Sequence, residues 1–211
     1  MKKFASEISN EEAAALPAAH FDGRIVVVSD RRSMTQACNY LAQQSMVGFD
    51  TETRPSFTAG RMNRVALLQL STRDRCYLIR LCKFRRLPEP VVALLENQQV
   101  QKIGAAVSGD ITGLNRISPV KARGFIDLQN EVRRFGIENV SLRKMAGIVL
   151  GQKVSKAQRL SNWEAQTLTE QQQMYAATDA WVCLKIYDKL LEAAEVPEVK
   201  QRGPKSQKES E

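Results

Sequence analysis

Val47-Gly48-Phe49-Asp50-Thr51-Glu52-Thr53 is the stretch that decides the fold. An apolar run ends there in two carboxylates, one residue apart, in what reads as the C-terminal half of a strand. Side chains at i and i+2 of a strand project from one face, so Asp50 and Glu52 should stand side by side, with Thr51 pointing the other way. Two like charges this close repel unless a positive charge lies between them. The pair is therefore either a solvated acidic strand end or the beginning of a divalent-cation site.

The pattern around this stretch predicts an α/β domain with a mixed central sheet flanked by helices. Apolar and β-branched runs predict strands at 24–28, 46–50, 65–71, 76–79, 100–104 and 124–128, and the third and fourth of these should form a hairpin. Helical spacing predicts a helix after Ser29-Asp30 and further helices near 88–96, 108–117, 130–135, 141–149 and 169–191.

The ends of the chain differ from its middle. Residues 1–20 are rich in Ala and Glu and predict an N-terminal lead, loosely attached, with one short helix. Residues 21–193 predict one domain, and 194–211 a polar tail that we expect to be disordered. No run of about 18 apolar residues occurs, so no membrane span is expected. The first ten residues lack the apolar segment of a secretory signal.

Composition excludes several kinds of chemistry. The chain has one histidine, His20, and four scattered cysteines without C-x-x-C spacing, so a zinc site or a nucleophile paired with histidine is not expected. The cysteines favour a reduced, cytoplasmic protein. The net charge of +8 lies within residues 21–196, which hold 25 basic and 17 acidic residues. A basic body favours an anionic partner, nucleic acid above all.

Two further carboxylates could join the first pair. Asp179 lies on the mostly apolar stripe of the last helix, where burying a lone carboxylate is costly unless it is paired or binds metal, and Tyr175 lies one turn before it. A core helix whose Asp pairs with an arginine is the alternative. Asp110 follows Gly109 at a helix start, where capping of free N–H groups is the commoner role.

The order of these pieces resembles the DEDD 3′–5′ exonuclease superfamily, and the Y-x-x-x-D helix resembles its DEDDy branch. The similarity to ribonuclease D and the Werner syndrome exonuclease domain extends from about Arg24 to Leu191. The segments that carry it are Phe49-Asp50-Thr51-Glu52, Leu67-Leu68-Gln69-Leu70, Lys102-Ile103-Gly104 with Gly109-Asp110, Leu160-Ser161-Asn162-Trp163 and Tyr175-Ala176-Ala177-Thr178-Asp179-Ala180.

The resemblance implies a ribonuclease H-like fold and a two-metal site. Asp50, Glu52, Asp110 and Asp179 would bind two Mg²⁺ or Mn²⁺ ions roughly 3.5–4 Å apart, as suits hard cations and oxygen ligands. Asp50 would bridge both ions, Glu52 and Asp179 would hold the ion that activates water, and Asp110 would help hold the other. Tyr175 would orient the attacking water.

The implied partner is nucleic acid with a single-stranded 3′ end. Arg54, Lys156 and Arg159 are candidate phosphate contacts, and Phe57 or Trp163 could stack on a base. A solvated face for the basic residues and core packing for Trp163 remain open.

The function expected is metal-dependent 3′–5′ exonuclease activity that releases nucleoside monophosphates. A catalytically silent nucleic-acid-binding module of the same fold is one alternative, although it would be expected to lose one of the acidic residues. A ribonuclease H-like endonuclease is the other.

Overall fold

The structure is a computed structural model, and it describes residues 4–56 and 63–195. The predicted tail, apart from its first two residues, and Phe57 lie outside these ranges. No helix in them is both long enough and apolar enough to span a membrane.

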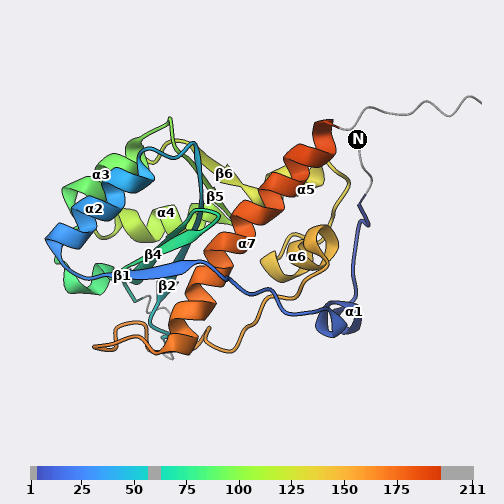
Figure 1. The fold of residues 1–211 in the computed structure, drawn as a ribbon, viewed down its shortest axis with the longest axis horizontal. Helices are drawn as coiled ribbons and strands as arrows, with labels where there is room; N and C mark the ends of the chain where they lie inside the picture. The colour runs from blue at the N-terminus through green and yellow to red at the C-terminus, as the bar shows by residue number, and fades with distance from the viewer. Residues whose placement is uncertain (1–3, 57–62, 196–211) are drawn as a thin grey trace, which may run out of the picture.

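Six strands form one mixed sheet in the order β1-β4-β3-β2-β5-β6 (Figure 1). They are β1 (Arg24–Val28), β2 (Met46–Thr53), β3 (Val65–Ser71), β4 (Arg75–Ile79), β5 (Gln101–Gly104) and β6 (Phe125–Asp127). The predicted hairpin is confirmed, because β3 pairs antiparallel with both β2 and β4. The remaining pairs are parallel. Asp50 and Glu52 thus lie within a strand near the middle of the sheet, at its carboxyl end.

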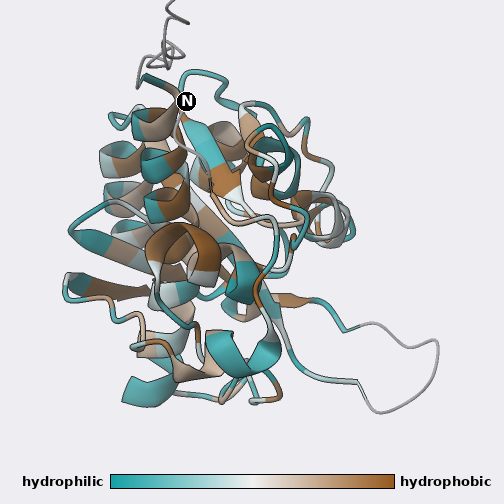
Figure 2. Ribbon diagram, turned by 90° about the vertical axis from the view of Figure 1, so that its right-hand side faces the viewer, coloured by the Kyte–Doolittle hydropathy of each residue, from teal (hydrophilic) through white to brown (hydrophobic). Residues whose placement is uncertain are grey.

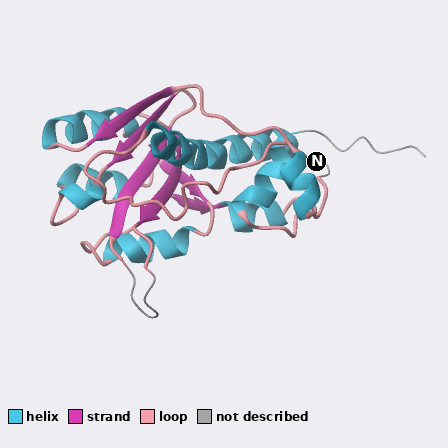
Figure 3. Ribbon diagram, turned by 90° about the horizontal axis from the view of Figure 1, so that it is seen from below, coloured by secondary structure: helices cyan, strands magenta, loops and turns pink. Residues whose placement is uncertain are grey.

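Helices lie on both sides of this sheet (Figure 3). They are α1 (Asn10–Ala15), α2 (Arg31–Leu41), α3 (Glu89–Glu96), α4 (Val107–Asn115), α5 (Leu128–Arg133), α6 (Leu142–Leu150) and α7 (Glu170–Glu195), with a short 3₁₀ helix at Leu81–Lys83. The long helix α7 crosses one face and contacts β1 to β5. Helices α2, α3 and α4 cover the other face, so the sheet is buried on both sides.

The alternation of side chains along the strands divides the core between the two faces. Phe49, Leu68 and Leu70 point toward α2 and α3, in one apolar cluster. Leu67 and Leu78 point toward α7 and pack with Trp163 in another. Hydrophobic segments accordingly lie in the interior of the ribbon in Figure 2.

The start of α4 differs from the prediction in a way that bears on Asp110. The helix begins at Val107 rather than at 108, and Ala106 precedes it with a left-handed backbone (φ 58°). The carboxylate of Asp127, at the end of β6, accepts hydrogen bonds from the N–H groups of Ala106 and Val107. Capping is therefore performed by Asp127, and Asp110 lies in the first turn of the helix without capping it.

The N-terminal lead contains the predicted short helix, and it packs on α6. Ala13 is fully buried. Ile8 and Leu16 lie so near Gly147 of α6 that an added Cβ there would approach their methyl groups to 3.2 and 3.3 Å. The backbone N–H of Ala19 also donates to the carbonyl of Lys153 at 2.9 Å. These contacts attach the lead to α6 and to the segment that follows it. The loose attachment expected from its Ala- and Glu-rich sequence is not what the structure has.

Candidate metal centre

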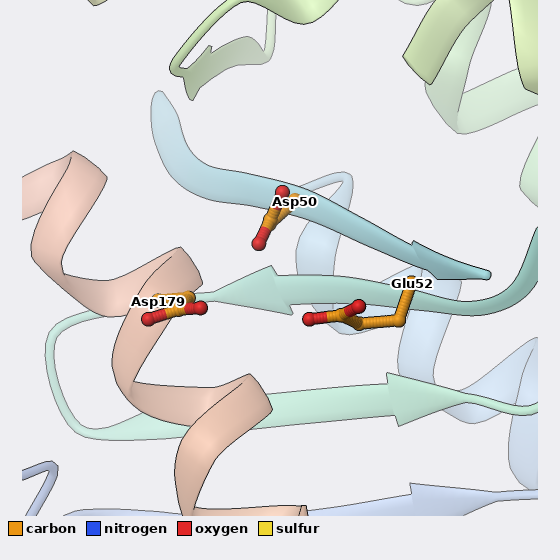
Figure 4. A group of neighbouring side chains, drawn as sticks. All are labelled: Asp50, Glu52 and Asp179. Carbon is orange, nitrogen blue, oxygen red and sulfur yellow. The ribbon is translucent and has the colours of Figure 1, made fainter. Parts of the chain in front are cut away.

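Three carboxylates from distant parts of the chain meet at the carboxyl end of β2. Asp50 and Glu52 project from β2 toward α7, and Asp179 projects from α7 (Figure 4). One carboxylate oxygen from each lies within 4.8 Å of the others. The i, i+2 spacing in the strand thus places two acids on one face, as predicted, and α7 brings the third.

A glycine allows α7 to approach the strand this closely. A Cβ added to Gly48 would lie 1.9 Å from the carbonyl oxygen of Ala180, so the backbones of β2 and α7 are in direct contact. Ala180 follows Asp179, and Gly48 precedes Asp50 by two residues on the same face. Close packing at this point fixes the separation of the two acids.

Crowding and burial raise the pKa values of the carboxyl groups. Burial, followed by the charges of Asp179, Asp110 and Glu52, holds the pKa of Asp50 well above its usual range. Burial, with the charges of Asp179 and Asp110, raises the pKa of Glu52 to about 8. Burial raises the pKa of Asp179 to about 7, against an opposing hydrogen bond with Tyr175.

Asp110 lies beside this group, on α4, but outside the set of three converging oxygens. The hydroxyl of Thr51 donates a hydrogen bond to its Oδ1 atom. Thr51 points to the opposite side of β2 from Asp50, so its hydroxyl holds Asp110 toward the α4 side of the strand. Burial raises the pKa of Asp110, and the bond from Thr51 acts against this shift.

Tyr175 lies on α7 beside the acidic residues, and its ring lies near that of Trp163. The two rings lie 6.0 Å apart between centroids. Burial, with the charges of Asp179, Glu52 and Asp50, raises the pKa of the Tyr175 phenol, so the hydroxyl keeps its proton. Trp163 is fully buried. This position fits core packing, the alternative that the sequence left open, and leaves no indole face for a base.

The donor set fits a divalent cation. Within the described part of the chain, no ion pair joins Asp50, Glu52 or Asp179 to a basic side chain. The Oδ1 atom of Asp179 is buried and has no hydrogen-bond partner among the residues that the structure describes. Such an acceptor is rare in a folded protein unless a cation or water fills the position. Carboxylate oxygens without His or Cys suit Mg²⁺ or Mn²⁺.

Comparison with known proteins agrees with this geometry. The family model for the 3′–5′ exonuclease domain matches residues 25–195. The chain belongs to the 3′–5′ exonuclease family. The mouse bifunctional 3′–5′ exonuclease/ATP-dependent helicase WRN is 36% identical over 185 residues, which are 83% of this chain and 13% of that protein. Ribonuclease D of Haemophilus influenzae is 31% identical over 162 residues, 76% of this chain and 40% of the relative.

The fold of this exonuclease family member is also shared with solved structures. The EXO domain of Aedes aegypti Nibbler superposes with a TM-score of 0.72 at 26% identity, covering 82% of this chain and 91% of that domain. The predicted ribonuclease H-like fold is thereby confirmed. The chain spans less than half the length of the two curated relatives named above.

A cavity of about 450 Å³ adjoins the acidic site of this exonuclease domain. Tyr175 and Asp179 form one of its walls, and the segment 155–158 and His20 of the lead form others. Lys156 and Arg159 are exposed and lie next in sequence to the lining residues Ala157 and Gln158, but they do not line the cavity themselves. Arg54 is exposed as well, and its guanidinium lies 3.5 Å from a carboxylate oxygen of Glu164.

Two residues of the site carry roles that the sequence analysis did not assign. Thr51 holds Asp110, and its place between the two acids of the strand was the available signal. Gln69 lies opposite Asp50 on β3. It is the one polar residue inside the run Val65–Leu70.

Proposed function

We propose that the protein is a metal-dependent 3′–5′ exonuclease that hydrolyses the terminal phosphodiester of nucleic acid and releases nucleoside monophosphates. The observation that carries the proposal is the convergence of the Asp50, Glu52 and Asp179 oxygens within 4.8 Å, without a basic partner. Membership of the 3′–5′ exonuclease family supports it.

The acidic residues would hold two Mg²⁺ or Mn²⁺ ions. Ions bound there would lower the pKa of a coordinated water and stabilise charge on the leaving oxygen. Asp50, which interacts with all three other acids, is assigned to both ions. Glu52 and Asp179 would hold the ion that activates water, and Asp110 would help hold the other. The Thr51 hydroxyl keeps Asp110 oriented.

Tyr175 would position the attacking water. Its phenol is protonated because burial and nearby carboxylates disfavour the phenolate. A protonated phenol donates a hydrogen bond, so the residue can orient a water molecule but is a poor proton acceptor. General-base work therefore falls to the carboxylates.

The substrate proposed is a nucleic acid with a single-stranded 3′ end. The terminal nucleotide would enter the cavity beside Tyr175, because that space opens directly onto Asp179. Lys156 and Arg159 are exposed and adjoin lining residues in the sequence. They would contact phosphates of the strand, which gives binding without sequence preference. Arg54 would contact a phosphate only after its ion pair with Glu164 is broken.

A nuclease assay tests the proposal. Wild type with Mg²⁺ or Mn²⁺ should convert a 5′-labelled single strand into a ladder that shortens one nucleotide at a time. Asp50→Ala should cut at least about 100-fold more slowly, since the metal site is lost. Tyr175→Phe should also lose most activity while its calorimetric Mn²⁺ affinity stays within about twofold of wild type. Internal cuts would indicate an endonuclease, and full activity of Asp50→Ala would overturn the assignment.

The same assay with DNA, RNA and a duplex with a recessed 3′ end would identify the substrate. We also propose a reducing compartment such as the cytoplasm as the place of action. All four cysteines are unpaired, which supports this location.

A further inference from the structure

Gln69 is a polar side chain in a buried position that an apolar residue would ordinarily occupy. It lies in β3 and is fully buried. Both its Oε1 and Nε2 atoms lack a hydrogen-bond partner among the described residues. A buried amide of this kind has given up its hydrogen bonds to water without replacement, which folded proteins rarely tolerate. Leucine or methionine would fill the position without that loss, and a partner gained when the site binds its cations would account for the amide.

The strand register identifies the partner. Asp50 and Gln69 are directly opposite in the antiparallel pair β2–β3. Side chains opposite each other project from the same face with Cβ atoms about 4.5–5.5 Å apart. This face is the one under α7. A Gln side chain is long enough to reach a carboxylate at that separation.

The other strand neighbours of Gln69 on this face carry no charged group. Leu78 is opposite it on β4 and belongs to an apolar cluster. Leu67 precedes it on the same face and belongs to that cluster too. Ser71 follows on the same face, and its hydroxyl donates to the carbonyl of Thr72 at 2.9 Å. Among these strand neighbours, the carboxylate of Asp50 is the strongest hydrogen-bond acceptor.

We propose that Gln69 is a positioning residue for the metal site: its Nε2 amide donates a hydrogen bond to the ionised Asp50 carboxylate and fixes its orientation toward the cations. This inference rests on the proposed metal-dependent function. A neutral amide suits the task, because a Lys or Arg at this place would form an ion pair with Asp50 and compete with the cations. Outer hydrogen bonds of this kind orient the groups that bind metals.

The test compares Gln69→Met with wild type and with Ser71→Ala as a matched control. Ser71→Ala removes a buried polar group from the same face of β3, next to Gln69 but farther from the acids. Calorimetric titration with Mn²⁺ and thermal unfolding with and without Mn²⁺ give readouts independent of catalysis. Gln69→Met should bind Mn²⁺ about tenfold more weakly. Its metal-free melting temperature should equal or exceed that of wild type, because two unpartnered atoms are gone.

The nuclease assay adds a second signature. Gln69→Met should need about tenfold more Mn²⁺ for half-maximal rate, and Ser71→Ala should match wild type. A lower metal-free melting temperature with unchanged Mn²⁺ affinity would show a purely structural residue and overturn the inference. Should Gln69→Met not fold, Gln69→Leu answers the same question. If wild type itself fails to bind Mn²⁺ more tightly than Asp50→Ala does, the proposed function fails instead.

Discussion

At the scale of single residues, the buried carboxyl groups of the acidic site repel one another when they are ionised, and this destabilises the metal-free protein. Burial and three neighbouring acids raise the pKa of Asp50 well above its ordinary value of 3.8. The pKa of Glu52 is raised to about 8. A carboxyl group whose pKa is higher in the folded than in the unfolded state binds more protons when folded. Stability without metal should therefore fall as the pH rises from about 4 to about 8.

Asp50→Asn should relieve this repulsion. At pH 8 and in EDTA, we expect the free energy of unfolding to rise by on the order of 1 kcal/mol, or about 2–4 °C in melting temperature for a domain of this size. The gain should shrink at pH 5, where the wild-type carboxyl groups carry their protons. Thermal unfolding at both pH values measures it. Asp188→Asn is the control, since it loses the Arg73 ion pair and should not be stabilised. A gain equal at both pH values would contradict the explanation.

The sequence could identify the acids but not how each is held. Spacing alone places Asp50 with Glu52 and Tyr175 with Asp179, because i, i+2 and i, i+4 relations are local. The capping role open to Asp110 is taken by Asp127, 17 positions further along the chain, and only the fold brings that carboxylate to the start of α4. The position of Gln69 beside Asp50 depends on the register between two strands, which the hydrophobic pattern does not specify to the residue.

At the scale of elements, the contact between β2 and α7 holds the site together. Gly48 and Ala180 touch through their backbones, and the acids of both elements lie just beyond this contact. Gly48→Ala should force α7 away from the strand. We expect a loss of about 1–3 kcal/mol in the free energy of unfolding, as for other overpacked cores. Mn²⁺ binding should weaken as well, because Asp179 moves away from Asp50.

Gly109→Ala is the matched control for this element. Nothing lies within 4 Å of a Cβ added there, and the residue is inside α4. An alanine in a helix interior should stabilise the protein by about 0.5–1 kcal/mol. Chemical denaturation measures both variants, and Mn²⁺ titration follows. If Gly48→Ala unfolds at the same denaturant concentration as wild type, the contact does not set the spacing.

The strands, the helices and the hairpin were largely predictable from the sequence, whereas contacts between segments far apart in the chain were not. The run Arg24–Val28 and the hairpin 65–79 are confirmed because their apolar patterns are short and local. The docking of the lead on α6 depends on Ile8 and Leu16 meeting Gly147, more than a hundred positions away. An Ala- and Glu-rich segment shows no such partner in its own sequence. The division of the chain at residues 20 and 193 stays a prediction.

At the scale of the whole molecule, the charge of +8 should appear as salt-dependent binding. Each phosphate contact to a single strand adds about 0.7 to the slope of log affinity against log salt concentration. Lys156 and Arg159 are exposed, and their sequence neighbours Ala157 and Gln158 line the cavity that opens onto Asp179. Replacing both with alanine in an Asp50→Asn background, which cannot cut, should lower the slope by about 1.4. Fluorescence anisotropy of a labelled single strand over a series of KCl concentrations measures it.

Lys189→Ala is the control that removes one positive charge at a position away from the cavity. Lys189 lies in the C-terminal part of α7, where its ammonium group is 2.7 Å from a carboxylate oxygen of Glu192. Removing it changes the net charge by one but takes away no group beside the cavity. We expect its slope to match that of the parent protein. If both changes reduce the slope in proportion to the charge removed, binding follows the overall field of the protein. The strand would then not pass along the segment 155–159, and the entry route proposed for it would be wrong.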